Sequence, residues 1–357
     1  MARKFETILV TGGAGFIGSN FIHYVFEKTD FAGKIVNLDA LTYAGNPESL
    51  ADLAGAFGGS RYFFEHADIR DRDAPKAIFS HYKPDAVVHF AAESHVDRSI
   101  LGPEAFVTTN IIGTYNLLEA ARNAWKGRDD VLFHHISTDE VYGSLGDSGY
   151  FTEETPYDPR SPYSASKAGS DHLVMAYHHT YGLPVTLSNC SNNYGPYQFP
   201  EKLIPLMIFN MLEDKSLPVY GDGKNIRDWI YVEDHNAAVW EVMRRGAAGR
   251  GYNIGGENEW ENIRLLGRLI EIVAEESGKR AESLRDLITY VTDRPGHDRR
   301  YAIDCSRVKA ELGWKRESSF DEGLRKTVRW YLEHKTWCEH VRSGEYKNWL
   351  ADNYGAR

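Results

Sequence analysis

The stretch TGGAGFIGS at residues 11–19 constrains the fold of this chain more than any other. It follows a short apolar run, TILV, and leads into a helical pattern. Gly13, Gly15 and Gly18 have the GxGxxG spacing, and Gly12 starts an overlapping GxxGxxG. A glycine-rich turn between a strand and a helix lets the backbone approach a pyrophosphate at the helix N-terminus. The stretch therefore predicts a dinucleotide-binding unit.

Acidic residues end the next two predicted strands. Asp39 ends the strand predicted over residues 34–39, where an acid is expected to contact the adenosine ribose. Because its carboxylate would repel a 2′-phosphate, the sequence favours NAD over NADP. Asp68 ends the strand predicted over residues 61–68, where it could reach the adenine or cap the following helix.

Strands and helices alternate through the first half of the chain, which predicts parallel strands with helices on both faces. The fold class is therefore α/β, a Rossmann-type doubly wound parallel sheet with a smaller, mostly helical substrate-binding domain. Ligands bind such sheets beyond the carboxyl ends of the strands. Strands are predicted over residues 7–10, 34–39, 61–68, 85–92, 131–137 and 184–190, and helices over 110–124 and 164–182.

The alternation breaks after about residue 188, where loops become rich in Pro, Gly and Asn. The helical pattern at 231–246 and the short strand at 251–256 are expected to return to the sheet. The predicted division is therefore interwoven. The NAD-binding domain comprises residues 1–187 plus about 224–256, and the smaller substrate-binding domain comprises 188–223 plus about 257–357.

Composition excludes several classes of protein. A net charge of −10 and the lack of a Lys/Arg block argue against nucleic-acid binding. No apolar run is long enough to span a membrane, and the N-terminal residues lead directly into a strand without a signal peptide. Cys190, Cys305 and Cys338 are scattered, so we expect a cytoplasmic protein with neither disulfides nor a zinc site.

Tyr163 and Lys167 in SPYSASKAG are four residues apart at the start of a predicted helix, so they lie on one face. An ammonium group near a phenol favours the phenolate and lowers its pKa. A phenolate beside a nicotinamide can take the proton of an alcohol while hydride leaves the carbon. With the glycine-rich turn, this pair makes the chain resemble an extended short-chain dehydrogenase/reductase. Thr138 then stands in the place of that family's catalytic Ser/Thr.

Two carboxylates, Asp139 and Glu140, directly follow Thr138 in STDEVYG at the end of a predicted strand. This pair resembles that of the dTDP-glucose 4,6-dehydratase family. The resemblance covers nearly the whole chain through AAESHVDRSI, CSNNYGPYQFPEKLIP, GDGKNIRDWIYVEDH and DRPGHDRRYAID. It implies oxidation of the sugar at C4, loss of water across C5 and C6, and return of hydride to C6. By the resemblance, Asp139 is the acid for the C6 oxygen and Glu140 is the base for C5.

The resemblance also implies which residues contact the ligands. With the glycines of the turn (Gly12, Gly15 and Gly18), the cofactor contacts are Phe16, Ile17, Asp39, Thr42, Asp68, Ile69, Ala91, Ala92, Ser94, Thr109, Tyr163, Lys167 and Asn193. The substrate contacts are Ser94, Thr138, Asn192, Lys202, Leu203, Pro218, Tyr220, Arg227, Asn262, Arg294 and His297. Ala40 and Asn189 depart from the family pattern, where Lys and Arg are frequent.

Other interpretations remain open at this level. Arg227 and Arg294 suit a nucleotide diphosphate, but each is adjacent to an aspartate that could pair with it. The side chains of His134 and His135 should point to opposite faces of a strand, so we expect packing and no metal site. Cys190 is expected in the core.

Three alternatives to the dTDP-glucose activity are a UDP-glucose 4,6-dehydratase, a nucleotide-sugar 4-epimerase and a non-catalytic NAD sensor. The epimerase would have no need of Asp139 and Glu140, and the sensor would have no need of the Tyr163–Lys167 pair. A homodimer is also predicted, because the helices at 110–124 and 164–182 are apolar on more than one face.

Overall fold

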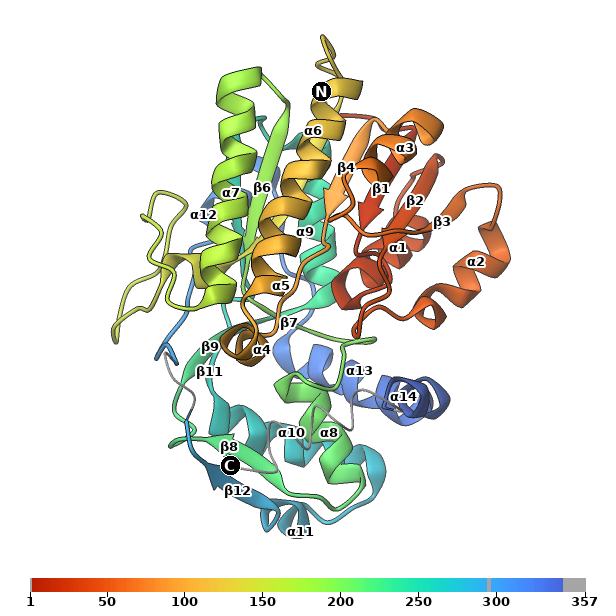
Figure 1. Ribbon diagram of the computed structural model, residues 1–357. Helices are drawn as coiled ribbons and strands as arrows, with labels where there is room; N and C mark the ends of the chain where they lie inside the picture. The colour runs from red at the N-terminus through yellow and green to blue at the C-terminus, as the bar shows by residue number, and fades with distance from the viewer. Residues whose placement is uncertain (1, 294–296, 343–357) are drawn as a thin grey trace.

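The computed structural model describes residues 2–293 and 297–342 and shows a large sheet above a smaller region (Figure 1). The large sheet has seven strands in the order β10-β6-β5-β4-β1-β2-β3, and every neighbouring pair is parallel. Its strands are β1 (Thr7–Thr11), β2 (Lys34–Asp39), β3 (Tyr62–His66), β4 (Ala86–His89), β5 (Leu132–Thr138), β6 (Val185–Cys190) and β10 (Arg250–Ile254). The predicted α/β fold with a doubly wound parallel sheet is confirmed. The chain order reverses between β1 and β4, which is where such sheets bind ligands.

Helices cover both faces of the large sheet (Figure 1). Side chains alternate along β1, so Ile8 and Val10 pack on one face while Leu9 packs on the other, and all three are fully buried. One face is covered by α1 (Phe16–Lys28), α9 (Val232–Arg245) and α12 (Ser306–Leu312). The other is covered by α3 (Asp73–Tyr82), α6 (Thr114–Ala124) and α7 (Pro162–Tyr181). Short elements at the rim are η1 (Pro47–Leu50), α2 (Ala51–Phe57) and α4 (Val96–Leu101).

The helix predicted over 110–124 differs from the structure in its first part. A short helix, α5 (Glu104–Phe106), runs into a π-helical segment, η2 (Val107–Gly113), which then continues as α6. Asn110 in this segment accepts a hydrogen bond from Glu93 N and donates one to Glu93 O. The wider turn therefore joins the helix to the loop after β4, and π-helical turns are common beside functional sites.

The smaller region holds short strands as well as helices. Strands β7 (Asn192–Tyr194), β9 (Ile226–Tyr231) and β11 (Glu259–Glu261) form one sheet, and β8 (Leu217–Tyr220) pairs with β12 (Ile288–Val291). Its helices are α8 (Leu203–Leu212), α10 (Asn262–Ser277), α11 (Ala281–Arg285), α13 (Phe320–Glu333) and α14 (Lys335–Val341). A separate apolar core lies between them, with Leu269 and Leu324 fully buried.

The chain returns to the large sheet after crossing the smaller region, as predicted. Helix α9 packs beside α1, and β10 adds an edge strand next to β6. Strand β9, inside the predicted 224–256 segment, pairs with β7 and β11 and not with the large sheet. The domain boundaries drawn from the sequence stay a prediction. No helix of the described ranges, 2–293 and 297–342, is long and apolar enough to cross a membrane.

Candidate active site

The glycine-rich turn connects β1 to α1 as the sequence predicted. Gly12 has a φ of 72°, and a Cβ there would lie 2.6 Å from Ala91 N. A Cβ on Gly18 would lie 2.3 Å from Gly12 O, so the helix approaches the turn too closely for any side chain. Gly15 differs, because its Cβ would meet only Gly12 O at 3.3 Å. Gly15 also caps α1 without a side-chain hydrogen bond, so the helix N-terminus is available to an anion.

Asp39 is held at the carboxyl end of β2 by two backbone amides. Ala14 N donates to Oδ2 at 2.9 Å and Leu41 N donates to Oδ1 at 2.8 Å. Burial raises the pKa of Asp39, and these two hydrogen bonds oppose that shift. Each carboxylate oxygen keeps a lone pair for a further donor, such as a ribose hydroxyl.

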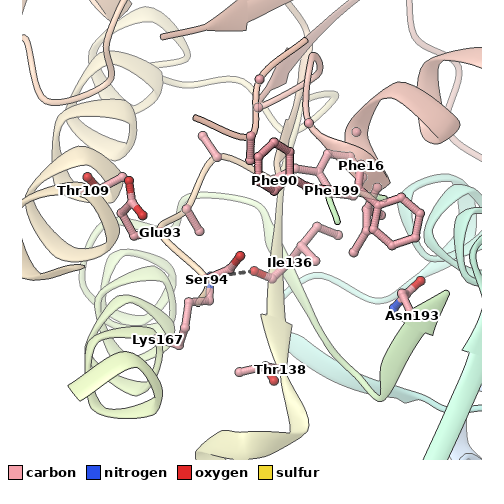
Figure 2. A pocket seen from close by; sticks show the side chains of 18 of the residues that line it. Phe16, Phe90, Glu93, Ser94, Thr109, Ile136, Thr138, Lys167, Asn193 and Phe199 are labelled. Atoms are coloured by element: carbon pink, nitrogen blue, oxygen red, sulfur yellow. Dashed lines mark hydrogen bonds between the residues drawn. The ribbon is translucent and has the colours of Figure 1, made fainter. Parts of the chain in front are cut away.

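A cavity of about 380 Å³ lies over the carboxyl ends of β1, β2, β4 and β5 (Figure 2). Every residue predicted to contact the cofactor lines it: Gly12, Gly15, Phe16, Ile17, Gly18, Asp39, Thr42, Asp68, Ile69, Ala91, Ala92, Ser94, Thr109, Tyr163, Lys167 and Asn193. Their roles in binding stay predictions. We call this the cofactor cavity.

Two observations indicate that the cofactor cavity can hold a dinucleotide. Gly15 lines the cavity, and a Cβ there would meet only Gly12 O, so the backbone at the helix N-terminus leaves room for a phosphate. Asn193 presents a buried side-chain oxygen that accepts no hydrogen bond from the described residues. A buried acceptor without a donor is costly unless a ligand or water supplies one.

The five predicted catalytic residues meet at one end of the cofactor cavity. Thr138 ends β5, and Asp139 and Glu140 begin the short helix η3 (Asp139–Tyr142). The Thr138 hydroxyl accepts a hydrogen bond from Glu140 N and donates to Asp139 Oδ1, both at 3.3 Å. Tyr163 and Lys167 come from α7, and Thr138 is one of the neighbours that lower the pKa of Tyr163.

Asp139 and Glu140 are adjacent in sequence but occupy different environments. Asp139 is 1% exposed, and burial, followed by the charge of Glu140, raises the pKa of Asp139 well above its usual value. Its Oδ2 accepts no hydrogen bond from the described residues. Glu140 is only half-buried and lines a second cavity as well as the first. Burial thus favours the protonated form of Asp139, and the more accessible Glu140 lies beside it. Acid–base catalysis requires one group that can donate a proton and another that can accept one.

The electrostatics of Tyr163 differ from the expectation. Burial raises the pKa of Tyr163 well above its usual value, with Glu140 as the next cause, whereas the sequence predicted a lowered pKa. The ammonium group of Lys167 donates a hydrogen bond to Ile136 O at 2.8 Å, as Figure 2 shows, and burial lowers the pKa of Lys167 itself. The side chains of the protein alone therefore favour the neutral phenol. An oxidised nicotinamide ring carries a positive charge, which would act in the opposite direction.

A second cavity, of about 170 Å³, lies under the first and extends into the smaller region. We call it the sugar cavity. The predicted substrate residues that line it are Asn192, Lys202, Leu203, Pro218, Tyr220, Arg227, Asn262 and His297. Ser94 and Thr138 line the cofactor cavity instead, and Arg294 lies outside the described residues. The two cavities share Glu140, Asn192, Glu201, Lys202, Leu203 and Trp229, so they adjoin where the predicted base lies.

Arg227 and the adjacent Asp228 on β9 do not form the ion pair that the sequence had left open. Asp228 accepts hydrogen bonds from Gly256 N and Asn258 N, on the side of the strand away from Arg227. Arg227 donates to Asp298 O, and its guanidinium lies 4.3 Å from the ring centre of Tyr301. Arg227 is therefore fixed in the wall of the sugar cavity.

Sequence reasoning missed residues that line both cavities. Glu201 and Trp229 lie at the shared border, and Glu201 has a nearly buried side chain. A Glu next to a Lys in a proline-rich loop is typical of a solvated pair, so the sequence carried no signal for Glu201.

The buried histidines take part in hydrogen-bonded packing. His134 is paired with Thr186 and Ser188, and His135 is hydrogen-bonded to Ser170. Cys190 is buried as expected, but it also lines the cofactor cavity. Burial raises the pKa of Cys190 to about 12, which makes it a poor nucleophile.

The two departures from the family pattern have different surroundings. Asn189 lines neither cavity but donates a hydrogen bond to Thr138 O at 3.1 Å, so it supports the catalytic strand end. Ala40 lines the cofactor cavity beside Asp39.

A Rossmann-type sheet with a glycine-rich turn and a buried Tyr–Lys pair defines a short-chain dehydrogenase/reductase. Comparisons with known proteins narrow this class. The family model for GDP-mannose 4,6 dehydratase matches residues 9–327, and the chain belongs to that family. The resemblance to dTDP-glucose 4,6-dehydratases is also confirmed. The chain is 56% identical to the dTDP-glucose 4,6-dehydratase of Shigella flexneri, over 98% of this chain and 99% of the relative. It is 55% identical to that of Neisseria meningitidis serogroup B, over 95% and 97%.

Solved structures show the same order of similarity. DesIV, a dTDP-glucose 4,6-dehydratase from Streptomyces venezuelae solved with NAD and TYD bound, has a TM-score of 0.86 and 46% identity, covering 94% of this chain and 99% of DesIV. The UDP-glucose 4-epimerase of Thermotoga maritima has a TM-score of 0.80 and 29% identity, over 92% and 99%. The fold is thus shared with epimerases, while the sequence is closer to the dehydratases.

Proposed function

We propose that this protein is an NAD-dependent lyase that converts dTDP-glucose to dTDP-4-keto-6-deoxyglucose. The observation that carries the proposal is the pair of unlike carboxyl groups, Asp139 with a raised pKa and the more accessible Glu140, in the cavity that Thr138 and Tyr163 also line. An epimerase has no step that uses such a pair. The names of the relatives support the same reaction.

The first step is the oxidation of the sugar at C4. Tyr163 takes the proton of the C4 hydroxyl while Thr138 donates a hydrogen bond to the oxygen, because both side chains line the same cavity. Bound NAD would supply the hydride acceptor for C4 and the hydride donor for C6. Lys167 lies one helical turn from Tyr163 and presents a cation to the same cavity.

The second step is the loss of water across C5 and C6. The C4 ketone acidifies the hydrogen on C5, and Glu140 removes it as a base. Asp139 donates its proton to the C6 oxygen, which leaves as water and produces the enone. Hydride at C6 and a proton at C5 then complete the product, so the sugar loses one water with no net oxidation. A buried acid with a raised pKa keeps its proton until the leaving oxygen needs it.

The ligand-binding roles of the remaining predicted residues are part of this proposal. The cradle at Gly15 and the carboxylate of Asp39 hold the two ends of the adenosine diphosphate. Arg227 and Lys202 supply positive charge to the nucleotide diphosphate in the sugar cavity.

Incubation of the pure protein with dTDP-glucose and NAD, followed by mass spectrometry, tests the function. The expected product is lighter than the substrate by one water. Parallel incubations with UDP-, CDP- and GDP-glucose should give less of the corresponding dehydrated sugar. An isomer of unchanged mass would identify an epimerase, and no product from any sugar would identify an NAD sensor. A faster reaction with UDP-glucose would reassign the substrate.

We also propose that the protein is a homodimer. The structure buries Leu117, Leu118 and Val174 of the two helices predicted at 110–124 and 164–182 in the core of the same chain. Other apolar side chains on this side are exposed, namely Ile100, Leu101, Val107, Ile112, Tyr115 and Tyr181. They lie on or beside α4, η2, α6 and α7, and a second copy of the same face would cover them. An exposed apolar face can pack against the same face of a second copy related by a two-fold axis.

Light scattering during size-exclusion chromatography tests the dimer. Ile112→Lys should give the monomer mass, while Tyr290→Lys, which changes an exposed apolar side chain on β12, should leave the dimer intact. A wild-type monomer at micromolar concentration would contradict the proposal. A cytoplasmic location is also proposed, because the three cysteines are free and buried.

A further inference from the structure

Tyr43, Arg98 and Glu201 come from three distant segments and contact one another in one cluster. The Tyr43 hydroxyl donates to Glu201 Oε1 at 3.1 Å. Arg98 Nε lies 3.2 Å from Glu201 Oε2, and the Arg98 guanidinium lies 3.7 Å from the ring centre of Tyr43. Each residue therefore touches the other two. Tyr43 belongs to the loop after β2, Arg98 to α4, and Glu201 to the loop before α8.

The cluster reaches the border of the two cavities through Glu201, while Tyr43 and Arg98 line a separate cavity behind it. Glu201 lines both of them, although its side chain is only 2% exposed. Thr42 and Ala44, on either side of Tyr43, line the cofactor cavity. Lys202, the next residue after Glu201, also lines both cavities and donates to Ser94 O at 3.0 Å. A segment that faces the cofactor is thus joined to a segment that faces the sugar.

The carboxylate of Glu201 depends on its partners. Burial raises the pKa of Glu201, while the positive charges of Lys202 and Arg98 oppose that shift and the Tyr43 hydroxyl supplies a hydrogen bond. Hydrogen bonds and nearby positive charges offset the cost of desolvating a buried carboxylate, so the loss of a donor destabilises the buried position. Removing the Tyr43 hydroxyl should therefore displace Glu201, and Lys202 with it, from the border.

The loop that carries Tyr43 is connected to the predicted ribose-binding acid. Leu41 has a φ of 49°, a left-handed conformation that is strained for a branched side chain. Its backbone N–H donates to Asp39 Oδ1, which holds the loop in place. A ligand that engages Asp39 thus acts on the same loop that positions Glu201.

We propose that Tyr43 and Arg98 are positioning residues that couple occupancy of the cofactor cavity to ligand affinity in the sugar cavity through Glu201. The inference rests on the proposed function, because it takes a dinucleotide for the first cavity and a nucleotide diphosphate for the second. The coupling is reciprocal: NAD tightens the binding of the nucleotide by the same factor by which the nucleotide tightens NAD.

Calorimetric titration of dTDP with and without saturating NAD⁺ tests the coupling. The wild-type protein should bind dTDP more tightly with NAD⁺, and Tyr43→Phe should reduce that ratio by up to about tenfold, the worth of one hydrogen bond to a charged group. Tyr43→Phe keeps the ring under Arg98, so the fold should persist, and its melting temperature is checked. Tyr82→Phe is the matched control, because Tyr82 makes the same kind of bond to Glu65 at 2.5 Å, away from both cavities.

A double-mutant cycle shows whether Tyr43 acts through Glu201. In a Glu201→Gln background, Tyr43→Phe should change the ratio little further, because the shared interaction is already weakened. The inference is overturned if the wild-type ratio is one, if Tyr43→Phe leaves it unchanged, or if the two substitutions are additive. Since dTDP binding requires no turnover, product formation without coupling rejects only this inference, and coupling without product rejects only the proposed reaction.

Discussion

The cofactor cavity and the sugar cavity adjoin at Glu140 but are built from different kinds of structure. The cofactor cavity lies over the ends of parallel strands, and each strand end places the residue that follows it. The sugar cavity is walled by the short strands β8 and β9, by the helices α8 and α10, and by His297 from the loop after β12. Strand ends of one sheet therefore set one site by local geometry, while the other depends on the packing of elements that are distant in the chain.

The carboxyl pair at the border gives the largest expected effect. Glu140→Gln and Asp139→Asn should each lower kcat by about 10²–10⁴, the usual worth of one base or acid, while NAD is still reduced on the enzyme. The two should then differ with a substrate whose C6 group leaves without a proton. Asp139→Asn should recover much of its rate and Glu140→Gln should not, because C5 still lacks a base.

Stopped-flow absorbance and product analysis measure both stages, and C5 exchange in deuterated water should be slower in Glu140→Gln. Rescue of Glu140→Gln instead would reverse the two roles. Rescue of neither would mean that the two carboxyl groups act as one coupled unit.

The cofactor cavity is tested by two glycines of one turn. Gly15→Ala should keep its melting temperature, because the new methyl group meets only Gly12 O at 3.3 Å, but it should weaken NAD binding by about 10- to 100-fold by crowding the phosphate. Gly18→Ala, whose methyl group would lie 2.3 Å from Gly12 O, should lower the melting temperature as well. Equal melting temperatures and equal NAD affinities in the two variants would contradict the different roles given to Gly15 and Gly18.

Asp39 tests the part of the cofactor cavity where the adenosine ribose is expected to bind. Asp39→Ala should lower the preference for NAD over NADP by about tenfold, because a carboxylate that repels a 2′-phosphate is lost. Asp68→Ala, at the end of the next strand, is the control and should leave the NAD/NADP ratio nearly unchanged. A wild-type ratio in Asp39→Ala would place this carboxylate away from the ribose.

The smallest effect is a change in the pH profile. Burial raises the pKa of Asp139, so the acid is protonated below that raised pKa and turnover should fall as the pH rises through it. The alkaline limb of kcat should weaken with the substrate whose C6 group needs no proton. An unchanged limb for both substrates would assign that limb to another group, such as Lys167.

The sequence predicted the cofactor cavity well because its signals are local. The spacing of Gly12, Gly15 and Gly18 and the acid at Asp39 are set by a single strand–helix–strand unit, and the structure places all four in the cavity. The pKa direction of Tyr163 was predicted wrongly, because the sequence shows the neighbouring Lys167 but not the depth of burial.

The π-helical start of the 110–124 helix was also not predicted. Periodicity reports which face of a helix is apolar, and it does not report a wider turn held by contacts of Asn110 with the loop at Glu93.

By itself the sequence determined the order of strands and helices, the glycine cradle and the presence of two adjacent carboxyl groups, since each depends on residues close together in the chain. Only the tertiary structure decided that Asp139 is buried and Glu140 is half-buried, and that Glu201 lies at the border of the two cavities in contact with Tyr43 and Arg98. The physical reason is that burial, and with it the energy of a charge, depends on how distant segments pack around a group.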